Sequence, residues 1–515
     1  MPPPAVHELR AGLLMCQYTK GSVRHIRLGN CEILQHVYFA LRGQRWETIP
    51  LLIKREEIRA RDLSFEIELE VEHKEGELAF FWRGRITGTE DGRISYATTG
   101  EAQSDFLRNR IGLCVLHPAQ SCRGLECMLL HADGSTEISR FPDLISPHQP
   151  FFNLRGITYR PIPGITAETL FGGDVFETED QRNWSDASFK TYSTPLSIQY
   201  PAQVRRGDEV SQQVELRVTA ESPMQSAAAH SPVSIAVDTE AASPMPWLGV
   251  VWEPQIPIGG FDFFRLELDL RKPGWQDDLA QAAAIGVRLE IAALATSKAD
   301  LENLRSVVEP FLAKVIRFAV FDPVTNVSDP ALLAVTRSLL APLPVGGGSH
   351  KYFAELNRNR EIALGGDFVV WPVDPQVHAD DAETAIENLA GQTPQLETAR
   401  SFCGNRGLHI SPVAVPKFDG NEGWCTICLK NLALAGARSL TFARALPLIE
   451  EVARFRADQV VACTSSDPLA ADALILRKGR KSFAWVVNLR NRAQNVELAN
   501  RSFSLDSYGI VRVQL

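Results

Sequence analysis

The sequence predicts a multidomain protein of β and α/β structure: an N-terminal β-sandwich, a (β/α)8 TIM-like barrel and a small C-terminal β-sandwich domain. Three observations carry this prediction. Strand signals without helical periodicity fill roughly the first 220 residues. From about residue 247, apolar runs alternate with amphipathic stretches, and from about residue 465 strand signals return. The 515 residues are enough for each part to bury its own core.

The predicted boundaries follow these changes of pattern. We expect the N-terminal domain over residues 1–222, a linker over 223–240, the barrel over 241–455 and the C-terminal β-domain over 456–515. The linker is predicted because the segment from Thr219 to Pro232 is small, polar and interrupted by prolines.

The N-terminal strands are predicted from strict alternation. Phe65–Glu72 alternates apolar and polar residues over eight positions, the period of a half-buried strand. A second run, Leu78–Thr87, follows a turn-like interval that contains Gly76. Many short strands separated by turn residues are typical of a sandwich.

Eight apolar runs predict the strands of a parallel barrel, because amphipathic segments such as 275–285 and 382–389 separate several of them. Only about a dozen residues, rich in proline and glycine, separate the first two runs. A crossover helix hardly fits there, so we expect an incomplete barrel that lacks its first helix. The eight runs are Trp247–Trp252, Phe264–Leu270, Val287–Ala293, Val315–Phe321, Lys351–Leu356, Phe368–Trp371, Leu408–Ala414 and Ser439–Ala443.

Composition excludes several classes of function. The net charge of −9 argues against a general nucleic-acid binder, which needs a basic surface. No apolar run is long enough to span a membrane, and the N-terminus does not have the pattern of a signal peptide. Nine scattered cysteines predict reduced thiols in a cytoplasm. The lone Cys425–Cys428 pair lacks the second pair that a zinc site usually needs, so we expect two packing residues and no metal.

Polar residues that follow the predicted strands are candidates for chemistry, because reactive groups lie at the carboxyl ends of barrel strands. The predicted catalytic residues are Glu355, His378 and Asp374. His378 can titrate near neutrality and, with Asp374, can activate water for ester or lactone hydrolysis. Such hydrolysis also needs a donor to the developing oxyanion. The substrate-binding residues predicted at the same end of the barrel are Asn357, Gln376, Glu253 and Arg265.

Two carboxylates lie within predicted strands, and a structural role is predicted for them. We expect Glu267 and Glu290 to be structural ion-pair partners of Arg265 or Arg288.

The densest polar segment is Phe176–Tyr192, where charged residues surround Trp184 and two further aromatic residues. Aromatic faces with polar groups between them are what sugar binding demands, and a buried ionic network is the equally weighted alternative. The predicted substrate-binding residues here are Asp180, Arg182, Asn183, Trp184, Asp186 and Lys190.

The segment Phe176–Tyr192 resembles a signature of the D-apionate lactonase family. Tyr352–Arg358, Pro375–Asp380 and Ile410–Val413 are similar to the family's barrel motifs, in the same order. The resemblance implies a sandwich, a TIM barrel and a C-terminal β-domain. It also implies hydrolysis of D-apionolactone to D-apionate in bacterial apiose catabolism, with a small carbohydrate or sugar lactone as partner and no cofactor.

Departures from the family pattern keep other functions open. The chain is predicted to be a shortened, divergent member, because the first barrel helix is missing and Thr441–Pro447 leads straight into a helix. One alternative is a glycoside hydrolase that uses two mouth carboxylates, with Glu355 as one of them. The other is a non-catalytic binder of sugar acids. The sequence leaves the exact substrate and the oligomeric state open.

Overall fold

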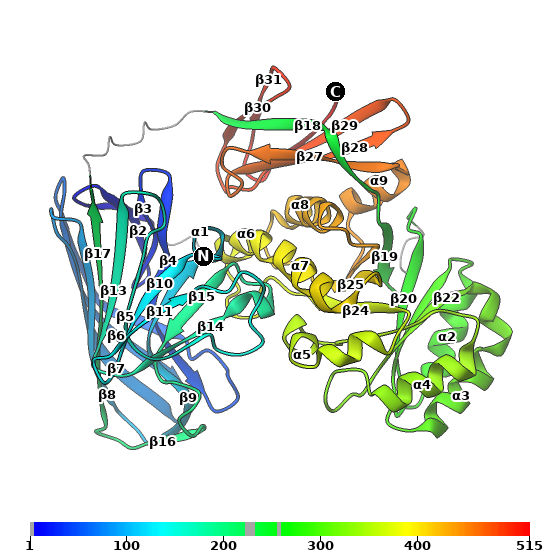
Figure 1. Ribbon diagram of the computed structural model, residues 1–515, viewed down its shortest axis with the longest axis horizontal. Coiled ribbons are helices and arrows are strands. Elements are labelled where there is room, and N and C mark those ends of the chain that lie inside the picture. Colours follow the sequence, from blue (N-terminus) through cyan, green and yellow to red (C-terminus); the bar gives the residue numbers. More distant parts are fainter. Residues whose placement is uncertain (1–4, 222–231, 255–258) are drawn as a thin grey trace. The chain divides into compact units, whose positions relative to one another are not determined.

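The structure is a computed structural model that describes residues 5–221, 232–254 and 259–515 (Figure 1). The chain divides into two compact units. The first consists of Met1–Gln181 and Ser188–Ala229, and the second of Arg182–Ala187 and His230–Leu515. The short segment Arg182–Ala187 therefore belongs to the barrel-containing unit although it lies far from the barrel in the sequence.

The first unit is one hydrogen-bonded network of seventeen strands around a large hydrophobic core, with a second, small cluster beside it. Its strands are β1 (His7–Ala11), β2 (Leu14–Thr19), β3 (Ser22–Leu28), β4 (Cys31–Gly43), β5 (Leu51–Ala60), β6 (Phe65–Glu75), β7 (Leu78–Gly88), β8 (Arg93–Ala102), β9 (Phe106–Pro118), β10 (Glu126–His131), β11 (Thr136–Arg140), β12 (Phe151–Tyr159), β13 (Ile165–Gly172), β14 (Phe176–Asp180), β15 (Ser188–Tyr192), β16 (Ala202–Val204) and β17 (Glu209–Ala220). Helix α1 (Ala119–Cys122) lies in this unit, whereas η1 (Gln181–Trp184) runs from it into the second unit.

The alternation in the sequence explains how these strands face the core. In β6 every second side chain from Phe65 to Val71 is buried, while the intervening glutamates are partly exposed. β6 pairs antiparallel with β7, and Gly76 takes a positive φ of 57° in the turn between them. Both predicted strands and the turn are confirmed here.

The second unit contains a closed barrel of eight parallel strands. Phe368 and Val370 pack with Ala292 and Ala319, which lie on other barrel strands, in a small buried hydrophobic cluster. The strands are β19 (Trp247–Val251), β20 (Phe263–Asp269), β21 (Leu289–Leu294), β22 (Val315–Phe321), β23 (Val345–Gly348), β24 (Phe368–Val373), β25 (Gly407–Val413) and β26 (Ser439–Phe442).

Helices lie between most of these strands; α2, α3 and α4, for example, lie outside β20 and β22 (Figure 1). No helix occurs among the described residues between β19 and β20, which are 252–254 and 259–262. Within the described part of the chain, no helix is long and apolar enough to cross a membrane. The helices are α2 (Trp275–Ala284), α3 (Lys298–Val308), η2 (Glu309–Lys314), α4 (Pro330–Leu340), α5 (Phe353–Arg358), η3 (Arg360–Leu364), α6 (Ala382–Glu387), η4 (Asn388–Gly391), α7 (Gln392–Cys403), α8 (Asn421–Leu434) and α9 (Pro447–Phe455).

The fifth barrel strand was predicted in the wrong place. It is β23, Val345–Gly348, and the predicted run Lys351–Leu356 instead leads into helix α5. Three glycines give β23 almost no apolar signal, so sequence periodicity misses it. The barrel requires a glycine at 346 because a Cβ there would lie 2.1 Å from the ring of Phe368. Glu355 and Asn357 are therefore helical residues.

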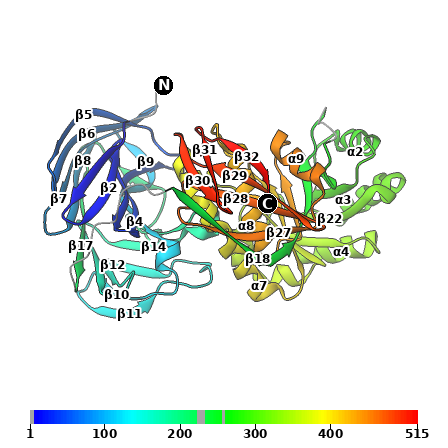
Figure 2. The ribbon, with the colours of Figure 1, turned by 90° about the horizontal axis from the view of Figure 1, so that it is seen from above.

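The predicted linker also differs from the structure. Its part 223–231 lies outside the described residues, but β18 occupies Val233–Pro244. β18 pairs antiparallel with β27 and parallel with β30 in a seven-stranded C-terminal sheet (Figure 2). Val233 and Ile235 are buried in the core of that sheet, which explains why they form a strand. The remaining strands are β27 (Gln459–Ser465), β28 (Ala471–Lys478), β29 (Lys481–Asn488), β30 (Gln494–Leu498), β31 (Arg501–Leu505) and β32 (Ile510–Gln514).

Candidate active site

A buried ionic network fills the amino-terminal half of the barrel interior. Arg265 Nη1 on β20 donates to Glu290 Oε1 on β21 at 2.8 Å, and Arg317 Nε on β22 donates to Glu290 Oε2. Across the barrel, Arg265 Nη1 also donates to Ser411 Oγ at 3.0 Å, and Arg317 Nη2 donates to Ser439 Oγ at 2.8 Å. Burial alone would raise the pKa of Glu290, but the charges of Arg317 and Arg265 outweigh it and lower that pKa to about 2. This layer is charged and ordered at neutral pH.

The next inward-facing residue of β20 is Glu267. Its register places it opposite Ala292, one of the interior core residues. Arg265 Nε donates to Glu267 Oε1 at 3.0 Å. The exposure of the side chain rises from 0% at Arg265 to 36% at Glu267, so water reaches the barrel interior from the carboxyl ends of its strands. That end is where barrel enzymes carry their reactive groups.

Glu355 on α5 is the carboxyl group with the most unusual surroundings. Its Oε2 atom is buried and has no hydrogen-bond partner within the part of the chain that the structure describes. Burial raises the pKa of this carboxyl above its ordinary value. Burial is the main cause that raises the pKa of the Tyr352 hydroxyl. The negative charges of Asp374 and then Glu355 raise it further, so these three side chains interact electrostatically. A partly desolvated carboxyl of this kind suits proton transfer near neutral pH.

His378 is oriented by a carboxylate from a distant part of the sequence. Its Nδ1 atom lies 2.7 Å from Asp186 Oδ2, and the Asp186 side chain is almost fully buried. Asn388 Nδ2 donates to the other Asp186 oxygen at 3.4 Å and to the carbonyl of Pro375 at 2.9 Å. Asp374, which is expected to act with His378 on water, accepts at Oδ1 from the backbone amide of Gln376. The partner of His378 comes from Arg182–Ala187, which belongs to this unit.

The same segment joins the His378 loop to α5. The rings of Trp184 and His378 lie 5.6 Å apart in an edge-on arrangement. The Arg358 guanidinium of α5 lies 5.2 Å from the centre of the Trp184 ring. Asn357 Nδ2, also on α5, donates to Asn183 Oδ1 at 2.9 Å. Five residues predicted from sequence are thus brought together: Asn183, Trp184, Asp186, Asn357 and His378.

Other predicted residues lie elsewhere. Glu253 is exposed just beyond β19. The Gln376 amide donates to the carbonyl of Asp380 at 2.6 Å and accepts from the Lys417 amide at 2.8 Å, so it joins two loops. The Arg182 side chain is fully buried, and its carbonyl accepts from Gln395 Nε2 at 2.8 Å.

The two ends of the polar segment Phe176–Tyr192 form an ionic network in the first unit. Glu179 Oε1 lies 3.5 Å from Lys190 Nζ and 3.8 Å from Arg110 Nη1. The Arg110 guanidinium lies 3.4 Å from the centre of the Tyr192 ring. Asp180 Oδ2 accepts from the Ser146 amide at 3.0 Å. These ends therefore follow the alternative of a buried ionic network, whereas the middle of the segment holds Asp186 and Trp184 beside His378.

Sequence reasoning missed two residues and one ion-pair partner. Tyr352 and His350 follow the glycine strand β23, whose weak signal concealed the carboxyl end of a barrel strand. Glu290 was expected to pair with Arg265 or Arg288, and its partners are Arg265 and Arg317.

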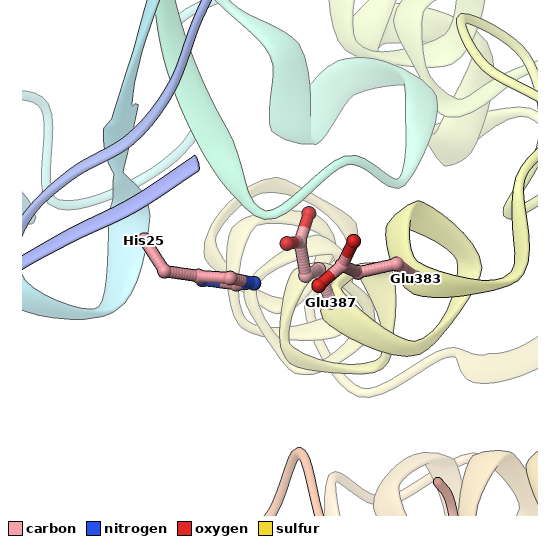
Figure 3. A group of neighbouring side chains, drawn as sticks. All are labelled: His25, Glu383 and Glu387. Atoms are coloured by element: carbon pink, nitrogen blue, oxygen red, sulfur yellow. The ribbon is translucent and has the colours of Figure 1, made fainter. Parts of the chain in front are cut away.

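Helix α6 carries a further acidic pair. Glu383 and Glu387 lie one turn apart on the same face of the helix (Figure 3). His25, drawn in the same figure, lies on β3 of the first unit. Two neighbouring glutamates on one helix do not by themselves define a site.

The closed barrel, its polar carboxyl end and the accompanying β-sheets define a multidomain TIM-barrel protein. Residues 1–221 match the model of the N-terminal domain of D-apionate lactonase, and residues 259–427 match that of its TIM barrel domain. The chain belongs to the D-apionate lactonase family.

A curated relative and two solved structures are also similar. The relative is a D-apionate lactonase of Brucella anthropi, 28% identical over 449 residues, which cover 79% of this chain and 72% of the relative. CelM2, a bifunctional glucanase-xylanase from a metagenome library, aligns with a TM-score of 0.40 at 10% identity over 55% of this chain and 97% of its own. A β-arabinopyranosidase aligns with a TM-score of 0.32 at 10% identity over 99% of this chain and 96% of its own.

Proposed function

We propose that this protein is a lactonase that opens a sugar lactone with water, with D-apionolactone as substrate and D-apionate as product. The buried, partly desolvated carboxyl of Glu355 at the carboxyl end of the barrel is the observation that carries the proposal. Family membership supports the same class of reaction. All nine cysteines are free thiols, which supports action in the cytoplasm, within carbohydrate catabolism.

In the proposed reaction Glu355 is the general base. Its carboxylate takes a proton from water while the water oxygen bonds to the lactone carbonyl carbon. The resulting tetrahedral oxyanion collapses, the bond from carbon to ring oxygen breaks, and the proton returns from Glu355 to the departing ring oxygen. One water is consumed and one hydroxy acid forms. Burial favours this role because the carboxylate form is less stable there and therefore more basic than in water.

His378 is proposed to donate to the oxyanion, in the orientation that Asp186 imposes on its ring. Asp186 is then a positioning residue. Asp186→Asn is expected to lower kcat about 100-fold with little change in KM, because a misplaced catalytic donor costs rate more than ground-state binding. Steady-state kinetics measure this. In a His378→Ala background the same substitution should have no further effect, whereas an equal loss in both backgrounds would contradict the positioning role.

The activity itself is tested by titrating acid release at constant pH from a panel of aldonolactones that includes D-apionolactone. The wild-type protein and Glu302→Gln, a change at an exposed residue of α3, should release acid at equal rates. Nitrophenyl glycosides should give no product. Release of nitrophenol together with inert lactones would reject the lactonase in favour of a glycosidase, and inertness toward both would reject it in favour of a sugar-acid binder.

A further inference from the structure

Glu267 lies inside the barrel mouth, on the side of the charged layer that water reaches. Its carboxylate is held by Arg265 Nε at 3.0 Å, and its side chain is 36% exposed. Burial would raise the pKa of Glu267, but the charge of Arg265 is the largest opposing cause and lowers that pKa, so the group is an acceptor at neutral pH. The mechanism proposed above leaves this carboxylate unused.

Polar atoms without partners lie in the same barrel as Glu267. Arg265, which holds Glu267, is 0% exposed, and its Nη2 atom has no hydrogen-bond partner within the described residues. His350 Nδ1 and Thr441 Oγ1 are likewise buried and unpaired across the described chain. Buried polar atoms are nearly always hydrogen-bonded, so unpaired ones in a barrel with a solvent-reached carboxylate point to a polar ligand.

The charges near Glu267 select the kind of ligand. Arg265 and Arg317 carry two positive charges, and Glu290 and Glu267 carry two negative charges. Burial lowers the pKa of His350, which leaves its ring neutral at neutral pH. This interior is therefore balanced and holds both donors and acceptors. It fits neighbouring hydroxyl groups of a neutral ring better than it fits an anion, which would need surplus positive charge.

We propose that Glu267, positioned by Arg265, binds the hydroxyl groups of the lactone ring and thereby determines specificity for hydroxylated lactones. The inference rests on the proposed lactonase function and deepens it. A charged acceptor that is already fixed by an arginine favours a hydroxylated lactone over one without hydroxyl groups, because only the hydroxylated lactone offers it hydrogen-bond donors.

Kinetics with two lactones test the proposal. Glu267→Gln is expected to raise KM for erythronolactone, which bears two hydroxyl groups, about tenfold. We expect kcat to stay within about twofold. Neither parameter should change for γ-butyrolactone, which has no hydroxyl group, and Glu302→Gln should behave as the wild type with both. An equal change for both lactones would overturn the proposal, and so would no change for either.

A binding measurement separates this proposal from the proposed reaction. Anhydroerythritol has the same cis-diol on a five-membered ring but no carbonyl to hydrolyse. Saturation-transfer NMR should detect it on the wild-type protein and on Glu302→Ala, and should lose the signal on Glu267→Ala, with thermal melts confirming that each variant is folded. If the protein shows this binding pattern but hydrolyses no lactone, the diol site is supported and the proposed lactonase activity is rejected. Equal signals on all three proteins would overturn the diol site, even for an active lactonase.

Discussion

Replacing Glu355 by glutamine is expected to lower kcat for lactone hydrolysis by about 100- to 10,000-fold, the usual contribution of a general base. Glutamine keeps the shape of the side chain but cannot take a proton from water. The residue is not part of the charged layer below, so the fold should survive. Stopped and continuous assays of acid release measure the loss, and unchanged circular dichroism excludes unfolding.

The pH dependence of kcat/KM is a second test of Glu355 as the general base. The base must be ionised, so kcat/KM of the wild type should rise as pH increases through the pKa of Glu355. Burial raises that pKa above its ordinary value of 4.5. The increase in kcat/KM should therefore occur at a pH above 4.5. Glu355→Gln should lose this limb. A variant with near wild-type kcat, or with an unchanged acidic limb, would show that another group is the base.

Glu290→Ala is expected to destabilise the barrel by about 3–5 kcal/mol, the usual cost of removing one partner from a buried ion pair. Two arginines, Arg265 and Arg317, would be left in the interior without the carboxylate that they share. Urea unfolding followed by circular dichroism measures the change. Ser439→Ala is the control, because it removes a neutral hydroxyl that bonds Arg317 and His409 but leaves the carboxylate in place, and it should cost less.

The ion pairs of Glu290 should also make the free energy of unfolding depend on pH. The pKa of Glu290 is lowered to about 2 in the folded state, whereas it is about 4.3 in an unfolded chain. The carboxylate therefore stabilises the fold fully above about pH 4.3, and this contribution is lost as pH falls toward 2. Glu290→Gln should lose less stability than the wild type over that window. Parallel curves for both proteins would contradict the lowered pKa.

Much of the fold could be predicted from periodicity, and the failures have physical causes. Seven barrel strands follow from apolar runs, because parallel strands are buried on both faces. β23 is missed because three of its four residues are glycines, and the Phe368 ring occupies the space that a side chain at Gly346 would need. The strand β18 is also missed by the sequence analysis, because its partners in β27 and β30 lie more than two hundred residues further along the chain.

The candidate site could be predicted by residue type but not by pairing. The sequence proposes Glu355 and His378 because each lies close to an apolar run. The partner of His378 is Asp186, 192 positions away, and no local pattern joins them. The partly exposed Glu267 and the buried Glu290 differ in solvent access, although both follow the same alternation within a strand. Only the closed barrel shows which of them water reaches.

A crystal structure of Glu355→Gln soaked with D-apionolactone tests the central claim most directly. The substitution should leave the lactone intact at the carboxyl end of the barrel. We predict a water held by the introduced side-chain amide about 3–3.5 Å from the lactone carbonyl carbon, and ring hydroxyl groups hydrogen-bonded to Glu267. A lactone bound elsewhere on the chain, or bound with its carbonyl turned away from position 355, would contradict the account.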